Sequence, residues 1–294
     1  YIVADADKLL QSAQLKGVLT MSDLPLLIEA ADLEQALDTP ELLILDTSSR
    51  ENYLRHHIPG ALHIAPAELQ RGEKPAVGKI PHEEQLQALF SRVGLRPDSH
   101  VLVYDDEGGG WAGRLIWTLD AIGHHRYSYL NGGLHAWLAG DHPVESGENT
   151  AESSELEIHI DSTPIAEIED FITLLDNRQL VIWDARSPEE YRGEKVLAER
   201  GGHIPGAVNL DWLELMDKAN NYRFKDLDSL KATLESLGIT PDRSVITHCQ
   251  THHRSGLSYL LMKILGYPHI KGYHGSWGEW GNRSDTPIRE GGEP

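Results

Sequence analysis

Short apolar runs along the chain alternate with longer segments in which apolar and polar residues mix at helical spacing. Four runs are bounded by turn residues and contain few polar positions: 42–45, 101–104, 181–183 and 245–247. Continuous apolar runs of this length are typical of strands buried on both faces of a parallel sheet. The pattern therefore predicts an α/β fold with a parallel central sheet in each half of the chain.

Two longer segments predict helices over 112–122 and 255–265, each following one of the strands. Both carry enough Leu, Ile and aromatic residues to pack on a sheet, and a glycine, Gly123 or Gly266, follows each. Glycine is common just past a helix because it adopts left-handed backbone without a steric penalty. The order strand, loop, helix is thus predicted in both halves.

The chain contains one pattern twice. The segment 42–64 matches the segment 180–210, which carries an eight-residue insertion. Three further pairs keep an offset of 143 residues: Gly113 with Gly256, Gly132 with Gly275, and Trp137 with Trp280. Ordered anchors at nearly constant spacing indicate a tandem duplication. A chain of 294 residues is long enough for the two separate cores that this implies.

The duplication sets the predicted domain boundaries. Residues 23–145 form the first domain and residues 159–294 the second. A polar, acidic stretch at 145–155 predicts a linker at 146–158. Residues 1–22 are taken as an N-terminal extension, since Met21 precedes the first clear pattern.

Composition and charge narrow the function. The chain is 40% hydrophobic and 24% charged, as is ordinary for globular proteins, and its formal net charge of −20 argues against nucleic-acid or anionic-membrane partners. No apolar run approaches the roughly 18 residues of a spanning helix, and the start lacks a signal-peptide layout. We expect a cytoplasmic protein. Its single cysteine excludes an internal disulfide and suits a reducing compartment.

That cysteine, Cys249, lies between a predicted strand and a predicted helix. Ligands of open α/β sheets bind at the carboxyl ends of strands, and helix N-termini stabilise anions through unpaired N–H groups. His252, His253 and Arg254 add donors to the same loop. We therefore expect the thiol pKa to lie below its usual value of about 8.5, which makes Cys249 a nucleophile. A buried apolar cysteine, the alternative, fits poorly in a loop rich in His and Arg.

Several motifs occur in a specific order. They are Asp46 and Asp184 at strand ends, His-Ile-Pro-Gly-Ala runs at 57–61 and 203–207, Tyr104-Asp105, and the run 131–137. On these motifs both halves resemble rhodanese domains, over about residues 24–287, and the tandem arrangement is similar to the thiosulfate and mercaptopyruvate sulfurtransferases. The resemblance implies two rhodanese-like domains, the first catalytically silent with Asp105 opposite Cys249.

The resemblance also implies a double-displacement reaction. The Cys249 thiolate would take the outer sulfur of thiosulfate as a persulfide, and cyanide or a thiol would then remove it. The expected substrate-binding residues form the loop after the nucleophile: Gln250, Thr251, His252, His253, Arg254 and Ser255. Asp184 and Arg186 are expected to form a structural pair beside the loop. We expect no cofactor and no metal, and a monomer.

Two departures leave the sulfur donor open. The loop resembles a bacterial rhodanese variant with histidine in the loop. It matches neither the Arg-Lys loop of the animal thiosulfate enzymes nor the Gly-Ser/Thr-Gly loop of the mercaptopyruvate enzymes. In addition, Glu190 precedes Tyr191 where relatives often carry a substrate-contacting arginine. A 3-mercaptopyruvate sulfurtransferase therefore stays an alternative.

Other classes of protein fit the sequence less well. A Cys-dependent phosphatase needs five residues between cysteine and arginine, but only four separate Cys249 from Arg254. The 16 histidines lack zinc spacing, and His57 and His203 are expected to satisfy turn backbone groups. Gly108–Gly110 lacks the Lys-Ser/Thr pair of a P-loop and is interpreted as a flexible remnant of the silent site. A persulfide carrier that delivers sulfur to a partner protein needs the same thiol, so the sequence does not separate it from an enzyme.

Overall fold

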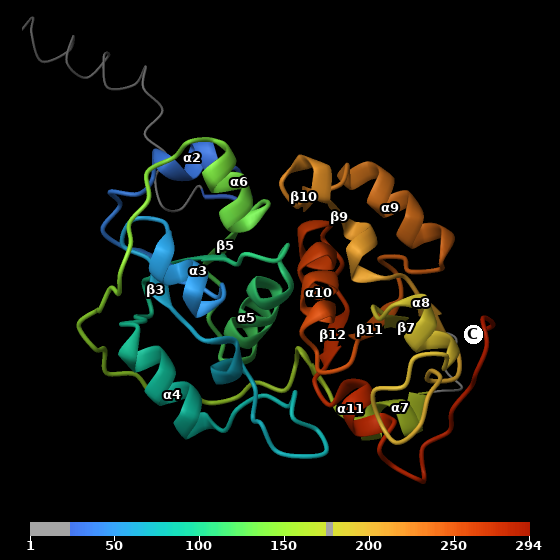
Figure 1. Cartoon of the computed structure of the whole chain (residues 1–294). Helices are drawn as coiled ribbons and strands as arrows, with labels where there is room; N and C mark the ends of the chain where they lie inside the picture. The colour runs from blue at the N-terminus through green and yellow to red at the C-terminus, as the bar shows by residue number, and fades with distance from the viewer. Residues whose placement is uncertain (1–23, 175–178) are drawn as a thin grey trace, which may run out of the picture.

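The computed structural model describes residues 24–174 and 179–294. The predicted extension at 1–22 lies outside these residues. Within them the chain folds into two halves that lie side by side (Figure 1). Each half has one five-stranded sheet in which every neighbouring pair of strands is parallel.

The sheet of the first half has the order β1-β5-β4-β2-β3. Its strands are β1 (Leu27–Ile28), β2 (Leu42–Asp46), β3 (Leu62–His63), β4 (His100–Tyr104) and β5 (Tyr127–Leu130). The helices are α2 (Ala30–Glu34), α3 (Arg50–Arg55), η2 (Pro66–Leu69), α4 (Glu83–Arg92), α5 (Gly110–Ala121) and α6 (Gly133–Ala139).

The sheet of the second half has the equivalent order, β6-β12-β11-β7-β8, which confirms the duplication. Its strands are β6 (Ile165–Ala166), β7 (Leu180–Asp184), β8 (Ala207–Asn209), β11 (Ser244–His248) and β12 (Ile270–Tyr273). The helices are α7 (Ile168–Leu174), α8 (Pro188–Arg192), η3 (Trp212–Leu215), η4 (Lys218–Asn220), α9 (Leu227–Ser236), α10 (Arg254–Ile264) and α11 (Ser276–Trp280). A small antiparallel hairpin, β9 (Met216–Asp217) with β10 (Arg223–Phe224), has no counterpart in the first half.

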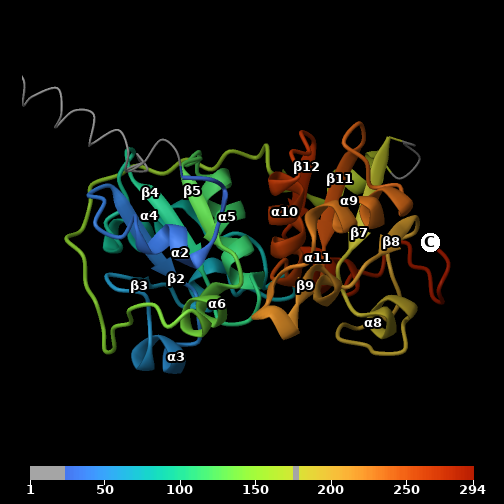
Figure 2. The same cartoon turned by 90° about the horizontal axis from the view of Figure 1, so that it is seen from above.

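The apolar core has three parts. One cluster covers the outer face of the first sheet and includes Trp137, and another covers the outer face of the second and includes Trp277 and Trp280. The third and largest is continuous across the boundary between the halves, where α5 and α10 face each other (Figures 1 and 2). These tryptophans are at most 1% exposed, so they are part of the packed core. Burial of the inner faces against each other holds the two halves together.

The two halves approach each other closely at the paired glycines of the repeat. A methyl group on Gly113 would overlap the backbone of Gly256, and one on Gly256 would lie 2.5 Å from the backbone nitrogen of Arg114. Any larger residue at either position must push α5 and α10 apart. The two glycines are thus required by contact between the helices.

The segment that joins the halves lies along the first one. Residues 146–162 contain no helix or strand. The Asn149 backbone N–H donates to the Tyr53 hydroxyl at 3.1 Å, and Ile158 is buried. The limits of the linker and of the two domains stay predictions.

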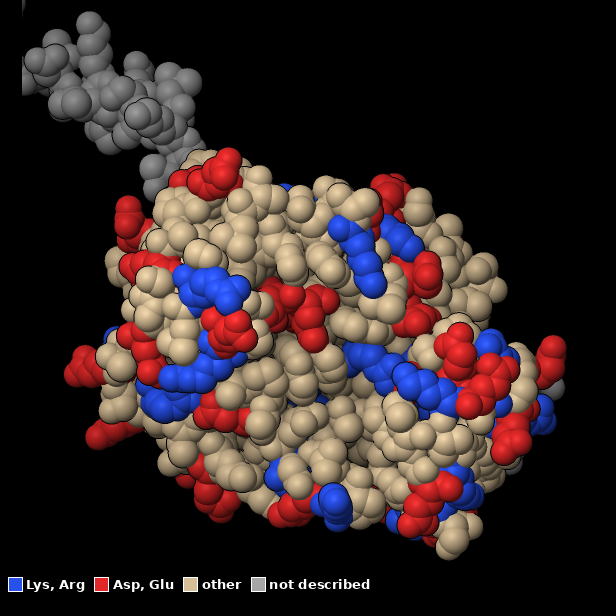
Figure 3. Space-filling view, viewed as in Figure 1, with Lys and Arg blue, Asp and Glu red and all other residues tan. Residues whose placement is uncertain are grey.

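Charged groups cover much of the surface without a dominant basic region on the face that Figure 3 shows. Acidic side chains gather there between the two halves, with basic ones to either side. Within the described part of the chain, no helix is long and apolar enough to cross a membrane.

Gly113→Ala tests the contact between the helices. Alanine favours the helical state over glycine by about 1 kcal/mol, so helix propensity alone predicts a more stable protein. We expect the opposite, a loss of about 1–3 kcal/mol in the free energy of unfolding, because overlap with Gly256 outweighs propensity. Thermal unfolding measures it. Gly292→Ala, at a position with no neighbour within 4 Å, is the control, and a Gly113 variant as stable as wild type would contradict the contact.

Candidate active site

The loop from Cys249 to His253 connects β11 with α10 and lies at the carboxyl edge of the second sheet. Cys249 is fully buried. Burial raises the pKa of its thiol. The Arg254 guanidinium, the Ser255 hydroxyl and the backbone N–H groups of Ser255 and Thr251 lower this pKa by a larger amount, so it lies below its usual value. The arrangement stabilises a thiolate, the nucleophilic form of cysteine.

Arg254, at the start of α10, is held by Glu190 of α8. Its two terminal nitrogens donate to the two Glu190 carboxylate oxygens at 2.7 and 2.9 Å. Burial lowers the pKa of Arg254, but its bond to Glu190 and the neighbouring anions raise it above the usual value overall. The glutamate that departs from the family pattern thus orients the loop arginine as a bidentate partner.

Asp184 and Arg186 form a fully buried ion pair below the loop. The Arg186 Nη2 atom lies 2.6 Å from the Asp184 Oδ2 atom, and the guanidinium stacks over the Trp277 ring at 4.3 Å. His248 Nε2 lies 3.6 Å from the same carboxylate. Burial lowers the pKa of His248 to about 4, so this imidazole is neutral at pH 7. The pair thus contacts Trp277 and His248 beside the active loop, which is the place where the sequence predicts a structural pair.

The two loop histidines point toward the boundary between the halves. His252 is fully buried in left-handed backbone, with φ of 56°, and its Nδ1 atom lies 2.7 Å from the Ser255 hydroxyl. Its ring meets Trp117 of the first half edge to face at 4.6 Å. Non-glycine residues in this backbone region are strained and cluster at functional sites. His252 therefore braces the loop against the first half.

His253 lies against the first half at a more open position. Its ring stacks on Trp111 at 4.1 Å, and its Nε2 atom contacts the Glu107 carboxylate. The side chains of His253 and Glu107 are 20% and 34% exposed. This is the one predicted loop histidine that solvent reaches.

Gln250 and Thr251 complete the predicted loop. The Gln250 side-chain nitrogen donates to the Leu197 carbonyl at 3.1 Å, so the insertion found only in the second copy contacts the loop. On the other side, Gly78 of the first half touches the Thr251 backbone so closely that a Cβ atom there would overlap it. The structure brings Gln250 to Ser255 together around Cys249, but their predicted contact with substrate stays a prediction.

The equivalent loop of the first half holds a carboxylate where Cys249 lies. Asp105 directly follows β4. Its carboxylate oxygens accept hydrogen bonds from the backbone N–H groups of Glu107, Gly108, Gly109 and Ala112 at 2.8–3.1 Å. Burial and the nearby Glu107 raise the pKa of Asp105 to about 6 despite these bonds. The glycines at 108–110 are buried, and the prediction of a flexible remnant is wrong because the carboxylate accepts the N–H groups of Gly108 and Gly109.

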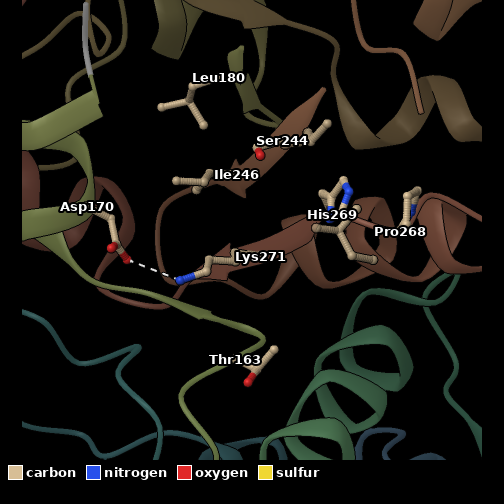
Figure 4. A pocket seen from close by; sticks show the side chains of 10 residues that line it. Thr163, Asp170, Leu180, Ser244, Ile246, Pro268, His269 and Lys271 are labelled. Atoms are coloured by element: carbon tan, nitrogen blue, oxygen red, sulfur yellow. Dashed lines mark ion pairs between the residues drawn. The ribbon is translucent and has the colours of Figure 1, made fainter. Parts of the chain in front are cut away.

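A cavity of about 250 Å³ lies at the opposite edge of the second sheet (Figure 4). Leu180 and Ser244, at the starts of β7 and β11, line it, and Lys271 pairs there with Asp170 at 3.7 Å. Ligands of such sheets bind at the carboxyl ends of strands, so this cavity is separate from the site.

His57 and His203 each bond a backbone carbonyl, of Tyr53 and Tyr191, as predicted.

Residues of the first half that contact the loop are absent from the sequence predictions, among them Gly78, Glu107, Trp111, Arg114 and Trp117. Arg114 directly follows the paired Gly113, and Leu257 holds the equivalent place after Gly256. The available signal was that the two copies differ in polarity directly after this glycine, with an arginine in the first copy and a leucine in the second. The contact across the boundary, however, depends on how the two copies pack, which no sequence pattern revealed.

The comparisons with known proteins agree with this geometry. The rhodanese-like domain family matches the chain twice, over residues 29–140 and 167–283. The protein therefore belongs to the rhodanese family.

Similar proteins extend over almost the whole chain. A thiosulfate sulfurtransferase of Azotobacter vinelandii is 52% identical over 267 residues, which is 91% of this chain and 98% of that protein. One of Pseudomonas aeruginosa is 50% identical over the same shares. A sulfur carrier protein of Thermus thermophilus is 32% identical over 89% of this chain and 95% of its own.

A solved structure supports the fold alone. The anaerobic ergothioneine biosynthesis enzyme of Chlorobium limicola superimposes with a TM-score of 0.79 at 20% identity, over 92% of this chain and 71% of that one.

Asp105→Ala tests the cradle of the silent loop. The change leaves three buried N–H donors and one partly buried donor without their acceptor, and we expect the free energy of unfolding to fall by about 3 kcal/mol. Asp105→Asn keeps an oxygen acceptor and should lose less. Denaturant unfolding measures both, with the exposed Asp38→Ala as control. An Asp105→Ala protein as stable as this control would rule out a structural role for the carboxylate.

Proposed function

We propose that the protein is a thiosulfate sulfurtransferase that carries sulfur as a persulfide on Cys249. The observation that supports this most directly is the position of the only cysteine, buried at a helix N-terminus beside Arg254, with a lowered thiol pKa. The two relatives at 50–52% identity are thiosulfate sulfurtransferases, which agrees with this donor.

The reaction proceeds in two displacements. The Cys249 thiolate attacks the outer sulfur of thiosulfate, a new S–S bond forms, and the old one breaks with its electron pair leaving on sulfite. Backbone N–H groups of Thr251 and Ser255 stabilise the negative charge on the sulfur. Cyanide, or a thiol in the cell, then attacks the outer sulfur and returns the electron pair of the broken bond to Cys249.

A second proposal is that the persulfide is delivered to a partner protein. The similarity to a sulfur carrier protein favours it. Both proposals use the same thiol and differ only in the acceptor. We further propose that the protein works without cofactor or metal, as a monomer, in the cytoplasm.

Intact-mass spectrometry tests the persulfide. We expect incubation with thiosulfate to add one sulfur atom to the purified protein, and cyanide to remove it, because Cys249 is the only sulfur nucleophile of its kind in the chain. Cys249→Ala should show neither change. The absence of an adduct on wild-type protein would refute thiosulfate as the donor, while transfer only to a protein acceptor would favour the carrier.

Glu190→Gln tests how Arg254 is set for an anionic donor. The change removes a negative charge beside Arg254, so the guanidinium is less neutralised and the KM for thiosulfate should fall. The variant should also lose about 3 kcal/mol of stability, since a buried ion pair loses one charge. Steady-state kinetics and thermal unfolding measure the two effects. Glu189→Gln, on the exposed side of the same helix, is the matched control, and a raised KM would show that Glu190 serves donor binding instead.

A further inference from the structure

A side chain of the silent half reaches the active loop. Arg114, on α5, is fully buried and crosses the boundary between the halves. Its Nη1 atom lies 3.4 Å from the Thr251 carbonyl oxygen and 3.5 Å from that of His252, while Nη2 donates to the Leu69 carbonyl at 2.7 Å. One guanidinium thus connects two consecutive peptide groups of the active loop to the backbone of the other half.

This guanidinium is unusual because its hydrogen-bond acceptors are all neutral. Among the residues that the structure describes, no carboxylate lies within ion-pair distance of Arg114, and its Nε atom has no hydrogen-bond partner. A buried cation is costly unless an anion compensates it. Burial lowers the pKa of Arg114 to about 9, while the negative charge of Cys249 raises it. The guanidinium also lies over the Trp117 ring at 4.6 Å, and the negative charge of Cys249 favours its cationic form.

The silent loop shows what the same position holds when no thiolate is present. In the repeat, Leu257 of α10 is equivalent to Arg114, and it reaches across the boundary into the silent loop. Its Cδ1 atom would lie 2.7 Å from a Cβ atom placed on Gly109. The Asp105 carboxylate in that loop already accepts four N–H bonds. An apolar residue therefore faces the saturated carboxylate, and a cation faces the loop with the reactive thiolate.

We propose that Arg114 is a positioning residue of the active site, by which the catalytically silent half fixes the Thr251 and His252 peptides and stabilises the Cys249 thiolate. The proposal deepens the sulfurtransferase function and rests on it for the role of the thiolate. It makes the first half a part of the active site, because the guanidinium that binds these two peptide groups comes from that half.

Other ionisable groups surround the same loop and must be counted with Arg114. They are Arg254 on α10, Glu190 on α8, Asp184 at the end of β7, Arg186 after β7, His248 on β11, His252 and His253 in the loop, His274 after β12, and Glu107 of the first half, which contacts His253. Arg254 is neutralised by Glu190, and Arg186 by Asp184. Arg114 has no carboxylate partner among the described residues, and it binds the loop carbonyls of Thr251 and His252, so its removal changes both the charge and the hydrogen bonds beside Cys249.

The pH dependence of Cys249 alkylation by iodoacetamide tests the proposal, because only the thiolate reacts and the chain has a single cysteine. The full-length protein is first treated with reductant and cyanide to free the thiol, and the adduct is followed by intact mass. In Arg114→Gln and Arg114→Met the midpoint should rise by about one pH unit, with alkylation below it about tenfold slower. Arg114→Lys keeps the charge and should keep the midpoint. Methionine is included because an apolar residue occupies the equivalent position on α10.

Lys263→Gln is the matched control. Lys263 is another cation at the boundary, but it pairs with Asp120 at 2.7 Å, so its loss should leave the midpoint unchanged. Folded Gln or Met variants with the wild-type midpoint would overturn the proposal, and so would a Lys variant that shifts as far as the neutral ones, which would indicate a role in packing alone. Alkylation needs no sulfur donor, so these results stand apart from the mass test with thiosulfate.

Discussion

The contact between Gly113 and Gly256 is the constraint on which the active site depends. Because the backbones of α5 and α10 touch there, the loops that precede the two helices lie across the boundary from one another. Side chains that follow each glycine then enter the opposite loop. The site is for this reason built by both halves, although the nucleophile belongs to one of them. A wider separation of the helices would leave the loop of Cys249 without its supports.

The two loops hold an anion in the same backbone frame by different means. In the first half the anion is a carboxylate, permanently attached and saturated by N–H donors, so nothing is left for chemistry. In the second half the anion is a thiolate whose sulfur has a lone pair with which it forms a bond to a further sulfur atom. A carboxylate oxygen accepts strong hydrogen bonds, whereas sulfur accepts weak ones, so the thiolate depends more on nearby positive charge. This difference agrees with the presence of Arg254 beside the Cys249 loop.

Much of this architecture is visible in the sequence. The apolar runs predicted the ends of β2, β4, β7 and β11 to within one residue. Strands buried on both faces are apolar along their whole length, which makes them easy to recognise in a sequence. The duplication predicted both sheets, and the loop composition placed Cys249 at a helix N-terminus.

Contacts across the boundary were not predictable in this way. The stacking of His253 on Trp111 and the hydrogen bonds from Arg114 to the active loop both depend on the packing of one copy against the other. Neither periodicity nor spacing within a copy contains that information. Glycine at both equivalent positions of the repeat did indicate a close approach of the backbone. The sequence did not show that the two glycines approach each other.

The burial of a solitary cysteine also bears on how the protein withstands oxidants. A thiolate that meets peroxide becomes a sulfenic acid, and many proteins rescue it by closing a disulfide with a second cysteine. This chain has none to offer, so repair must come from a small thiol that enters the site. The Cys249 side chain is buried, yet the sulfur donor and acceptor must reach it, and a repairing thiol would use the same access. The repair of the one reactive sulfur thus depends on the route by which its substrates enter.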